Sequence, residues 1–325
     1  MCWIMRGIIL VNLGTPTSNE KADVKNFIAE MLSDPLLTDK SRWLSKLLAT
    51  RIIAPQAAAR SSAKYKLIWR NEEPFISPII YNMTKLAEAI ESKKGMAVSI
   101  AMRYGMPDIR SAFKELNQKC PLLHEVIIFP LYPHYAQSTT QTTIKEIGEV
   151  FYRHPHSFRL KIAEPYFNHP EYINALAESA KPYINDIDKL IFVYHSLPNK
   201  QQETAWKKGK EFDYVYQIKE TNRLICDKLN IKPNDALLFF SSQRDDNWLK
   251  PFLDQSIGKL PELGWKTVAI MSPGFPSDNM ETLFDIDIEA RKLFMEAGGE
   301  KFSFIPSLNY NEEWVDAIWN IIEKM

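Results

Sequence analysis

Short apolar runs alternate along the chain with longer segments in which apolar residues recur at every third or fourth position. Runs of about four to eight apolar residues are typical of strands buried on both faces, and the longer spacing is typical of amphipathic helices. The apolar runs predict eight strands, at Gly7–Leu13, Ala97–Arg103, Glu125–Leu131, Leu160–Ala163, Leu190–Tyr194, Ala236–Ser241, Thr267–Met271 and Phe302–Ile305.

Helical spacing lies between most of these strands. It predicts nine helices, at Lys21–Leu32, Tyr81–Ser92, Ile109–Lys119, Thr142–Tyr152, Glu171–Ala180, Gln217–Leu229, Leu249–Ile257, Glu281–Ala297 and Glu312–Lys324. Such alternation favours parallel sheets with helices on both faces. Residues 33–80 break the rhythm and carry four prolines, which a closed barrel of repeated units would not accommodate easily. We therefore predict an α/β fold with two open parallel sheets rather than a TIM barrel.

The second series of strands restarts near Leu160, after a His-Pro-His segment at 154–156. We place a domain boundary near residue 158, so that residues 1–158 form the first domain and residues 159–307 the second. The last helix, within 308–325, either stays with the second domain or packs back on the first.

Composition and charge exclude several classes of protein. Of the 325 residues, 45% are hydrophobic and 12% aromatic, which excludes wholesale disorder. Forty basic residues balance forty acidic ones, so nothing favours bulk attraction to nucleic acid or to an anionic membrane. The three cysteines are widely spaced, which fits a reducing compartment and offers no zinc or iron–sulfur ligand set. No apolar run approaches the roughly 20 residues of a membrane-spanning helix, so we expect a cytoplasmic protein without a transmembrane segment.

Two side chains suited to metal chemistry follow buried strands. His195 comes directly after Leu-Ile-Phe-Val-Tyr, and Glu281 begins the helix that follows another apolar run. Ligands of open α/β sheets bind outside the carboxyl ends of the strands, and an imidazole facing a carboxylate suits a divalent first-row metal and can move protons. The alternatives are structural: His195 would only hydrogen-bond to a backbone carbonyl, and Glu281 would only interact favourably with the dipole of the helix that it begins.

Two further carboxylates follow Glu281 on the same predicted helix. Asp285 and Glu289 lie four and eight residues later, which places three acids on one face, where like charges repel. They form either a solvated acidic stripe or a path that carries hydrated cations to Glu281. Ser277 and Asp278 are plausible N-caps of this helix.

Other strand ends carry candidate ligands for a carboxylate. Tyr135, Ser138 and Thr139 follow the third strand, where the hydroxyls either cap the next helix or bind an anion. Arg103 and Tyr104 end the second strand, where the guanidinium either neutralises a buried acid or pairs with a propionate.

The first strand ends in Asn-Leu-Gly-Thr-Pro (12–16), in which Gly14 predicts a tight turn. The motifs G-x-G-x-x-G, the P-loop and G-x-S-x-G are all absent from the sequence, so a nucleotide cofactor and a serine hydrolase are not expected.

Seven groups of residues, in family order and spanning nearly the whole chain, resemble those of the ferrochelatases, which insert ferrous iron into a porphyrin. They are Asn-Leu-Gly-Thr-Pro (12–16), Ile-Trp (68–69) with Ser-Pro-Ile (77–79), Met-Arg-Tyr-Gly (102–105), Leu-Tyr-Pro-His-Tyr (131–135) with Ser-Thr-Thr (138–140), His-Ser-Leu-Pro (195–198), Trp-Leu-Lys-Pro (248–251) and Gly-Phe-Pro-Ser-Asp-Asn-Met-Glu-Thr-Leu (274–283). Any one of these matches is weak, but the ordered series is specific.

The resemblance implies two Rossmann-like halves of the class II chelatase type, with the porphyrin in the cleft between them. It implies that His195 and Glu281 face the metal as catalytic residues, that Fe²⁺ is a substrate, and that no iron–sulfur cluster is held. The first segments look like those of the protoporphyrin-using type, so the expected product is haem b. The residues that it places around the porphyrin are Asn12, Leu13, Arg103, Tyr104, Tyr135, Ser138 and Thr139.

Metal insertion displaces two pyrrole protons, so a base must lie beside the ring. We assign this role to neutral His195, because histidine ordinarily titrates near neutrality, and we assign attraction of the cation to Glu281. The opposite division stays open, as do removal of iron from haem and a non-catalytic tetrapyrrole carrier. The sequence also leaves open the oligomeric state and a peripheral membrane contact through Trp69 and Phe75.

Three positions depart from the family pattern. Asn279 stands where a second histidine often precedes the glutamate. Residues 71–76 and 242–247 replace the usual loops at the two lips of the expected cleft, so their effect on substrate binding stays open.

Overall fold

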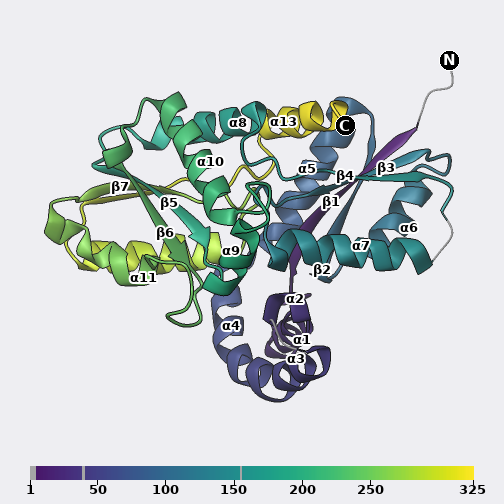
Figure 1. Cartoon of the computed structure of the whole chain (residues 1–325), viewed down its shortest axis with the longest axis horizontal. Helices are drawn as coiled ribbons and strands as arrows, with labels where there is room; N and C mark the ends of the chain where they lie inside the picture. The colour runs from purple at the N-terminus through teal and green to yellow at the C-terminus, as the bar shows by residue number, and fades with distance from the viewer. Residues whose placement is uncertain (1–4, 39–40, 154–155) are drawn as a thin grey trace. The chain divides into compact units, whose positions relative to one another are not determined.

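The computed structural model describes residues 5–38, 41–153 and 156–325 (Figure 1). Residues 1–4, with Cys2, and His154 and Pro155 lie outside this part of the chain. The chain divides into two compact units. The first comprises the described residues up to Tyr132 together with Ala136–Glu164 and Ile322–Met325, and the second comprises Pro133–Tyr135 and Pro165–Ile321.

The first unit is built on a four-stranded parallel sheet with the order β2-β1-β3-β4. Its strands are β1 (Arg6–Thr15), β2 (Ala97–Gly105), β3 (Glu125–Pro130) and β4 (Arg159–Ile162). Helices α6 (Ile109–Lys119) and α7 (Thr142–Arg153) pack on a face that buries Ile9, Val11 and Ile128. Helix α5 (Pro78–Lys94) packs against β1 and β2 as well.

Residues 33–80, which break the alternation of strand and helix, are largely helical. After α1 (Lys21–Leu32) come α2 (Pro35–Thr38), α3 (Arg42–Leu48), a π-helical turn η1 (Ala49–Ile53) and α4 (Ala54–Ile68). Two of the four prolines begin helices: Pro35 opens α2 and Pro78 opens α5, where a missing N–H costs little. Pro55 lies where η1 runs directly into α4, and Pro74 lies in the loop before α5. Figure 1 shows these helices gathered beyond the end of β1.

The second unit repeats the plan with the strand order β6-β5-β7-β8, again all parallel. Its strands are β5 (Lys189–His195), β6 (Ala236–Ser241), β7 (Thr267–Met271) and β8 (Lys301–Phe304). One face buries Ile191, Val268 and Ile270 against the helices that follow β6 and β7. The helices of this unit are α8 (Pro170–Ala180), α9 (Asn199–Trp206), α10 (Tyr214–Leu229), α11 (Leu253–Ser256), η7 (Glu281–Ala290), α12 (Arg291–Glu296) and most of α13 (Glu312–Glu323).

The predicted domain limits need correction. Strand β4 pairs with β3, and the N–H of Ala163 donates to the carbonyl of Ile128, so residues 159–164 complete the first sheet instead of opening the second domain. Helix α13 groups with the second unit as far as Ile321, where Trp314 packs against Tyr166 and Tyr172. The last four residues group with the first unit.

Two local predictions were also wrong. The helix expected at Leu249–Ile257 shrinks to α11, because the N–H of Leu249 donates to the carbonyl of Leu197 and Trp248 bridges to Pro198. Gly14 does not make a tight turn: it lies within β1 with φ of +128°, and a Cβ there would lie 1.9 Å from the carbonyl oxygen of Tyr104. The helix expected at Glu281–Ala297 is found, as the π-helix η7 up to Ala290 and as α12 from Arg291 to Glu296. All eight strands are found where the apolar runs predicted them.

Candidate active site

His195 and Glu281 come together in the second unit. His195 is the last residue of β5, and Ser241, the last residue of β6, is its partner in the parallel register. Paired residues of neighbouring parallel strands point to the same face of a sheet. Glu281 begins η7, ten residues after β7 ends at Met271, and its Oε2 lies 3.9 Å from Nε2 of His195. The glutamate is 9% exposed, whereas the imidazole remains partly open to solvent.

The backbone fixes which nitrogen of His195 faces Glu281. Nδ1 lies 2.5 Å from the carbonyl oxygen of Ser196, which can only accept a hydrogen bond. The network therefore assigns the proton of the neutral ring to Nδ1 and leaves a lone pair on Nε2. An ionised glutamate is also only an acceptor, so two acceptors face one another across the 3.9 Å gap. A proton or a metal cation between them satisfies both.

Three neighbours hold the pair in place. The hydroxyl of Ser241 donates a short hydrogen bond to Oε1 of Glu281. The hydroxyl of Tyr214 donates to the backbone carbonyl of His195 at 3.0 Å, and the ring of Trp248 lies 6.3 Å from the imidazole between centroids. Burial, together with the nearby charge of Glu281, raises the pKa of Tyr214, so this phenol stays protonated as a donor.

The start of η7 differs from the prediction. Asn279, not Ser277 or Asp278, accepts the N–H of Glu281, at 2.8 Å. Asp278 instead accepts the hydroxyl of Thr282 at 2.9 Å and the side-chain amide of Asn309 at 2.7 Å, which ties the loop before Glu281 to a later loop. The family's frequent second histidine is thus replaced here by the residue that caps Glu281.

Asp285 and Glu289 lie on the same π-helix as Glu281. Exposure increases along this series, from buried Glu281 through half-buried Asp285 to exposed Glu289. Among the residues that the structure describes, no group of three or more His, Cys, Asp or Glu side chains is arranged to hold a metal ion. The candidate metal position therefore rests on the two side chains of the pair.

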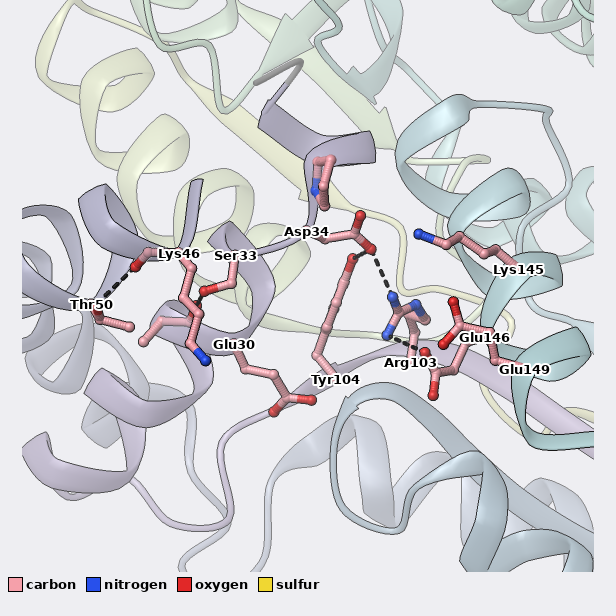
Figure 2. A pocket seen from close by; sticks show the side chains of 12 residues that line it. Glu30, Ser33, Asp34, Lys46, Thr50, Arg103, Tyr104, Lys145, Glu146 and Glu149 are labelled. Atoms are coloured by element: carbon pink, nitrogen blue, oxygen red, sulfur yellow. Dashed lines mark hydrogen bonds and ion pairs between the residues drawn. The ribbon is translucent and has the colours of Figure 1, made fainter. Parts of the chain in front are cut away.

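The first unit contains a separate ionic cluster. Figure 2 shows Arg103 and Tyr104 pointing from β2 toward Asp34 in a pocket of about 420 Å³. The guanidinium of Arg103 lies 2.7 Å from Asp34 and 3.5 Å from Glu146, and its Nε donates to the hydroxyl oxygen of Thr142 at 2.9 Å. Arg103 thus neutralises a buried acid, one of the two roles that the sequence left open.

The carboxylate of Asp34 is saturated with donors. Burial alone would raise its pKa, but hydrogen bonds from Thr142, the N–H of Leu36 and Tyr104, with the charge of Arg103, outweigh it and lower the pKa. The side chains of Arg103 and Asp34 are only 12% and 5% exposed. Little of the guanidinium is left to meet a propionate.

The other predicted porphyrin contacts fall in both units. Asn12 and Leu13 lie near the carboxyl end of β1, where the side chain of Asn12 accepts the N–H of Leu13 at 2.8 Å. Ser138 and Thr139 lie in the π-helical turn η2 (Gln137–Gln141). Tyr135 belongs to the second unit: its N–H donates to the side chain of Gln217 at 2.7 Å, and its ring lies 4.9 Å from that of Phe212.

The profile described as Ferrochelatase matches residues 5–325. The chain belongs to the ferrochelatase family. The coproporphyrin III ferrochelatase of Lactococcus lactis subsp. lactis is 31% identical over 323 residues, covering 98% of this chain and 98% of the relative. The ferrochelatase of Brucella canis is 32% identical over 327 residues, covering 98% of this chain and 90% of the relative.

Solved structures share the fold of this ferrochelatase family member at much lower identity. SirB from Bacillus subtilis with Fe³⁺ matches with a TM-score of 0.56 and 14% identity, covering 98% of this chain and 95% of that chain. The sirohydrochlorin chelatase SirB from Bacillus subtilis subspecies spizizenii in complex with cobalt matches with a TM-score of 0.53 and 11% identity, covering 98% and 94%. The predicted α/β fold of the class II chelatase type is confirmed.

Family membership makes the chain a metal chelatase of haem synthesis, with a porphyrin and ferrous iron as its substrates. No helix in the described parts of the chain is both long and apolar enough to cross a membrane. Sequence reasoning missed Ser241 and Tyr214, which hold the pair. The position of Ser241 at the end of a strand could have indicated that it lies near the site. Tyr214, the first residue of α10, carries no comparable sequence signal.

Proposed function

We propose that this protein inserts Fe²⁺ into protoporphyrin IX, releasing two protons and forming haem b. The observation that carries the proposal is the pair of opposed acceptors, Nε2 of His195 and Oε2 of Glu281, 3.9 Å apart at the ends of the second sheet. Family membership supports iron insertion into a porphyrin. The choice of protoporphyrin rests on the segments Asn-Leu-Gly-Thr-Pro and Met-Arg-Tyr-Gly.

The reaction needs a base for protons and a ligand for the metal. The free-base ring carries two N–H groups, and Fe²⁺ replaces both protons, so charge and atoms balance when two H⁺ leave. Nε2 of His195 carries a lone pair and remains partly open to solvent, so it accepts a pyrrole proton and passes it to water. We assign the proton transfer to His195 on this ground.

Glu281 suits the metal better than it suits the proton. Its Oε1 is occupied by the hydroxyl of Ser241, and Oε2 is directed at the gap. First-row ions bind imidazole nitrogen and carboxylate oxygen at about 2.0–2.2 Å. The 3.9 Å between Nε2 and Oε2 would admit a cation held by two such bonds, and Nε2 would then accept a pyrrole proton only after the metal has left it. Asp285 and Glu289, increasingly exposed along the π-helix, would lead hydrated Fe²⁺ to this oxygen.

The first unit supplies substrate contacts in this proposal. We assign Asn12, Leu13, Ser138 and Thr139 to the porphyrin, and Tyr135 of the second unit to the same substrate. Arg103 and Tyr104 would shape these surroundings through Asp34, because their polar groups are already bonded there. Bending the macrocycle exposes its nitrogen lone pairs, and binding energy from the ring's periphery is the source of that distortion.

An anaerobic absorption assay tests the proposal. Purified protein is mixed with Fe²⁺ and either protoporphyrin IX or coproporphyrin III, and the porphyrin and haem bands are followed. We expect faster metallation of protoporphyrin IX, lost in Glu281→Ala and His195→Ala. Glu296→Ala is the matched control, because this exposed carboxylate lies on the helix that continues η7 and contacts Lys292.

Each other outcome has a defined meaning. Faster metallation of coproporphyrin III would keep the chelatase and change its substrate. Porphyrin binding without metallation would contradict the proposal, and haem with a ferrous trap would then test removal of iron.

A further inference from the structure

The side chain of Ser241 occupies one carboxylate oxygen of Glu281. Ser241 is 4% exposed and ends β6, and its carbonyl accepts the N–H of Ser196 at 2.9 Å, so its backbone is tied to β5 next to His195. Its hydroxyl has one hydrogen and two acceptors in reach, Oε1 of Glu281 and the carbonyl of Tyr194 at 3.3 Å. The bond to Glu281 is the shorter one and its acceptor is charged, so the hydrogen belongs there.

The backbone after Ser241 supports a fixed position for this hydroxyl. Ser242 has φ of +60°, a left-handed conformation that non-glycine residues rarely adopt. The chain bends at this residue, and Ser241 is the last residue in the ladder with β5. Such conformations persist where surrounding structure holds them and often lie beside functional sites.

We propose that Ser241 keeps Glu281 a one-oxygen ligand, so that the site binds its metal loosely enough to release it into the porphyrin. The inference rests on the proposed function of Glu281. With Oε1 occupied, only Oε2 faces Nε2 of His195. Without the hydroxyl, both oxygens become available, and a carboxylate that binds through both oxygens suits larger, harder cations.

Looser binding matters because the metal is cargo. A metal bound more tightly before insertion than during insertion lowers kcat, even though KM for the metal falls as well. Mn²⁺ binds most nitrogen and oxygen sites more weakly than Fe²⁺ does. An increase in affinity caused by a second carboxylate oxygen should therefore be easiest to measure with Mn²⁺. Ser241 is therefore a positioning and selectivity residue that acts through Glu281.

The experiment uses the full chain with two readouts. Mn²⁺ binding without porphyrin is measured by electron paramagnetic resonance of the free ion, and kcat and KM for Fe²⁺ are measured anaerobically. For Ser241→Ala we expect Mn²⁺ to bind about tenfold more tightly, and kcat and KM for Fe²⁺ to fall together. The tenfold change corresponds to a charged hydrogen bond's usual contribution. A merely structural serine would not tighten Mn²⁺ binding when removed.

Matched variants distinguish the loss of the Ser241 hydroxyl from the general effect of a smaller buried side chain. Ser241→Thr keeps the hydroxyl and should behave as the wild type. Ser272→Ala removes another buried serine hydroxyl, just past the end of β7, that has no hydrogen-bond partner in the described residues, and should change neither readout. Should Ser241→Ala unfold, Ser241→Gly, which also lacks the hydroxyl and adds no metal ligand, gives the same test.

The results also distinguish this inference from the proposed function. Unchanged or weaker Mn²⁺ binding in Ser241→Ala, or no measurable binding in either protein, overturns the inference even if the wild type makes haem. Tighter Mn²⁺ binding in Ser241→Ala supports it even if the chosen porphyrin proves to be the wrong substrate.

Discussion

Two ionic clusters lie at strand ends in this protein, one in each unit, and they differ in how much of their bonding capacity is used. In the first unit, Asp34 receives donors from Arg103, Tyr104 and Thr142. In the second unit, one carboxylate oxygen of Glu281 accepts a hydrogen bond from the hydroxyl of Ser241, and the other oxygen faces the acceptor Nε2 of His195.

The difference teaches where chemistry is to be expected. A buried carboxylate that already accepts several hydrogen bonds stabilises its own surroundings and has little capacity left for a ligand. Two acceptors that face each other with no hydrogen between them attract a cation. The sequence suggested functional residues in both regions. Their hydrogen bonds differ, and on this ground we interpret the first cluster as structural and propose that the pair in the second unit is reactive.

The largest expected effect is loss of turnover at the reactive pair. Glu281→Ala should lower the rate of iron insertion by roughly 10³-fold or more, because it removes the oxygen that meets the metal. His195→Ala should lower it by about 10²–10⁴-fold, the usual range for a general base. The free energy of unfolding of both variants, measured by urea titration, should lie within about 1 kcal/mol of the wild-type value. Turnover at the wild-type rate in either variant would contradict the assignment of the pair.

The structural cluster should respond in the opposite way. Asp34→Ala leaves the guanidinium of Arg103, which is 12% exposed, without its main partner. Removing one partner of a buried ion pair costs about 3–5 kcal/mol, so a large fall in the free energy of unfolding is expected from urea titration. A stable variant would show that Arg103 has another partner to turn to.

His134, which belongs to neither cluster, should make the stability of the protein depend on pH. Burial lowers the pKa of His134 to about 3, and its Nε2 lies 2.9 Å from the hydroxyl of Thr221. Below pH 6.5 the unfolded chain binds a proton at this histidine, and the folded protein does not. The contribution of His134 to the free energy of unfolding is therefore complete above about pH 6.5 and is lost as the pH falls toward 3. The slope is at most about 1.4 kcal/mol per pH unit.

His134→Gln should flatten that slope between pH 6 and pH 4 while leaving the acid limb of Asp34. The pKa of Asp34 is lowered, so its contribution is present above its unfolded pKa of about 3.8 and is lost only below that value. Urea titrations at a series of pH values measure both windows. An unchanged slope in His134→Gln would mean that His134 protonates in the folded state.

The smallest effect is expected at the rim of the structural cluster. Glu146 lies 3.5 Å from Arg103, and its side chain is 35% exposed. Glu146→Gln should cost less than about 1 kcal/mol, because solvent screens a partly exposed pair. A cost as large as that of Asp34→Ala would place the main partner of Arg103 at the rim.

Much of the fold could be predicted from the sequence because its signal is local. Each buried parallel strand is an apolar run, and His195 follows one of them directly. Residues 33–80 were harder to predict, because prolines usually indicate breaks, whereas Pro35 and Pro78 begin helices and Pro55 lies where η1 runs into α4. The π-helix at Glu281 shares its spacing of apolar and acidic residues with an α-helix, so pattern alone does not separate them.

The roles of polar side chains could be predicted only in part, because partners lie far apart in the sequence. Arg103 meets Asp34 at a separation of 69 residues, and Ser241 meets Glu281 at a separation of 40. Sequence left the guanidinium two roles, and the hydrogen bonds of Asp34 favour the structural one. Nothing local to Ser241 indicates that its hydroxyl takes one oxygen of the glutamate.

The central claim is that chemistry belongs to the unsatisfied pair and stability to the satisfied cluster. The most direct test compares Glu281→Gln with Asp34→Asn in a single anaerobic turnover, with porphyrin already bound and the rate of iron insertion expressed per folded molecule. We predict that Glu281→Gln binds porphyrin but inserts iron at least about 10²-fold more slowly, whereas Asp34→Asn inserts it within about threefold of the wild-type rate. Wild-type insertion by Glu281→Gln, or its loss in folded Asp34→Asn, would contradict the account.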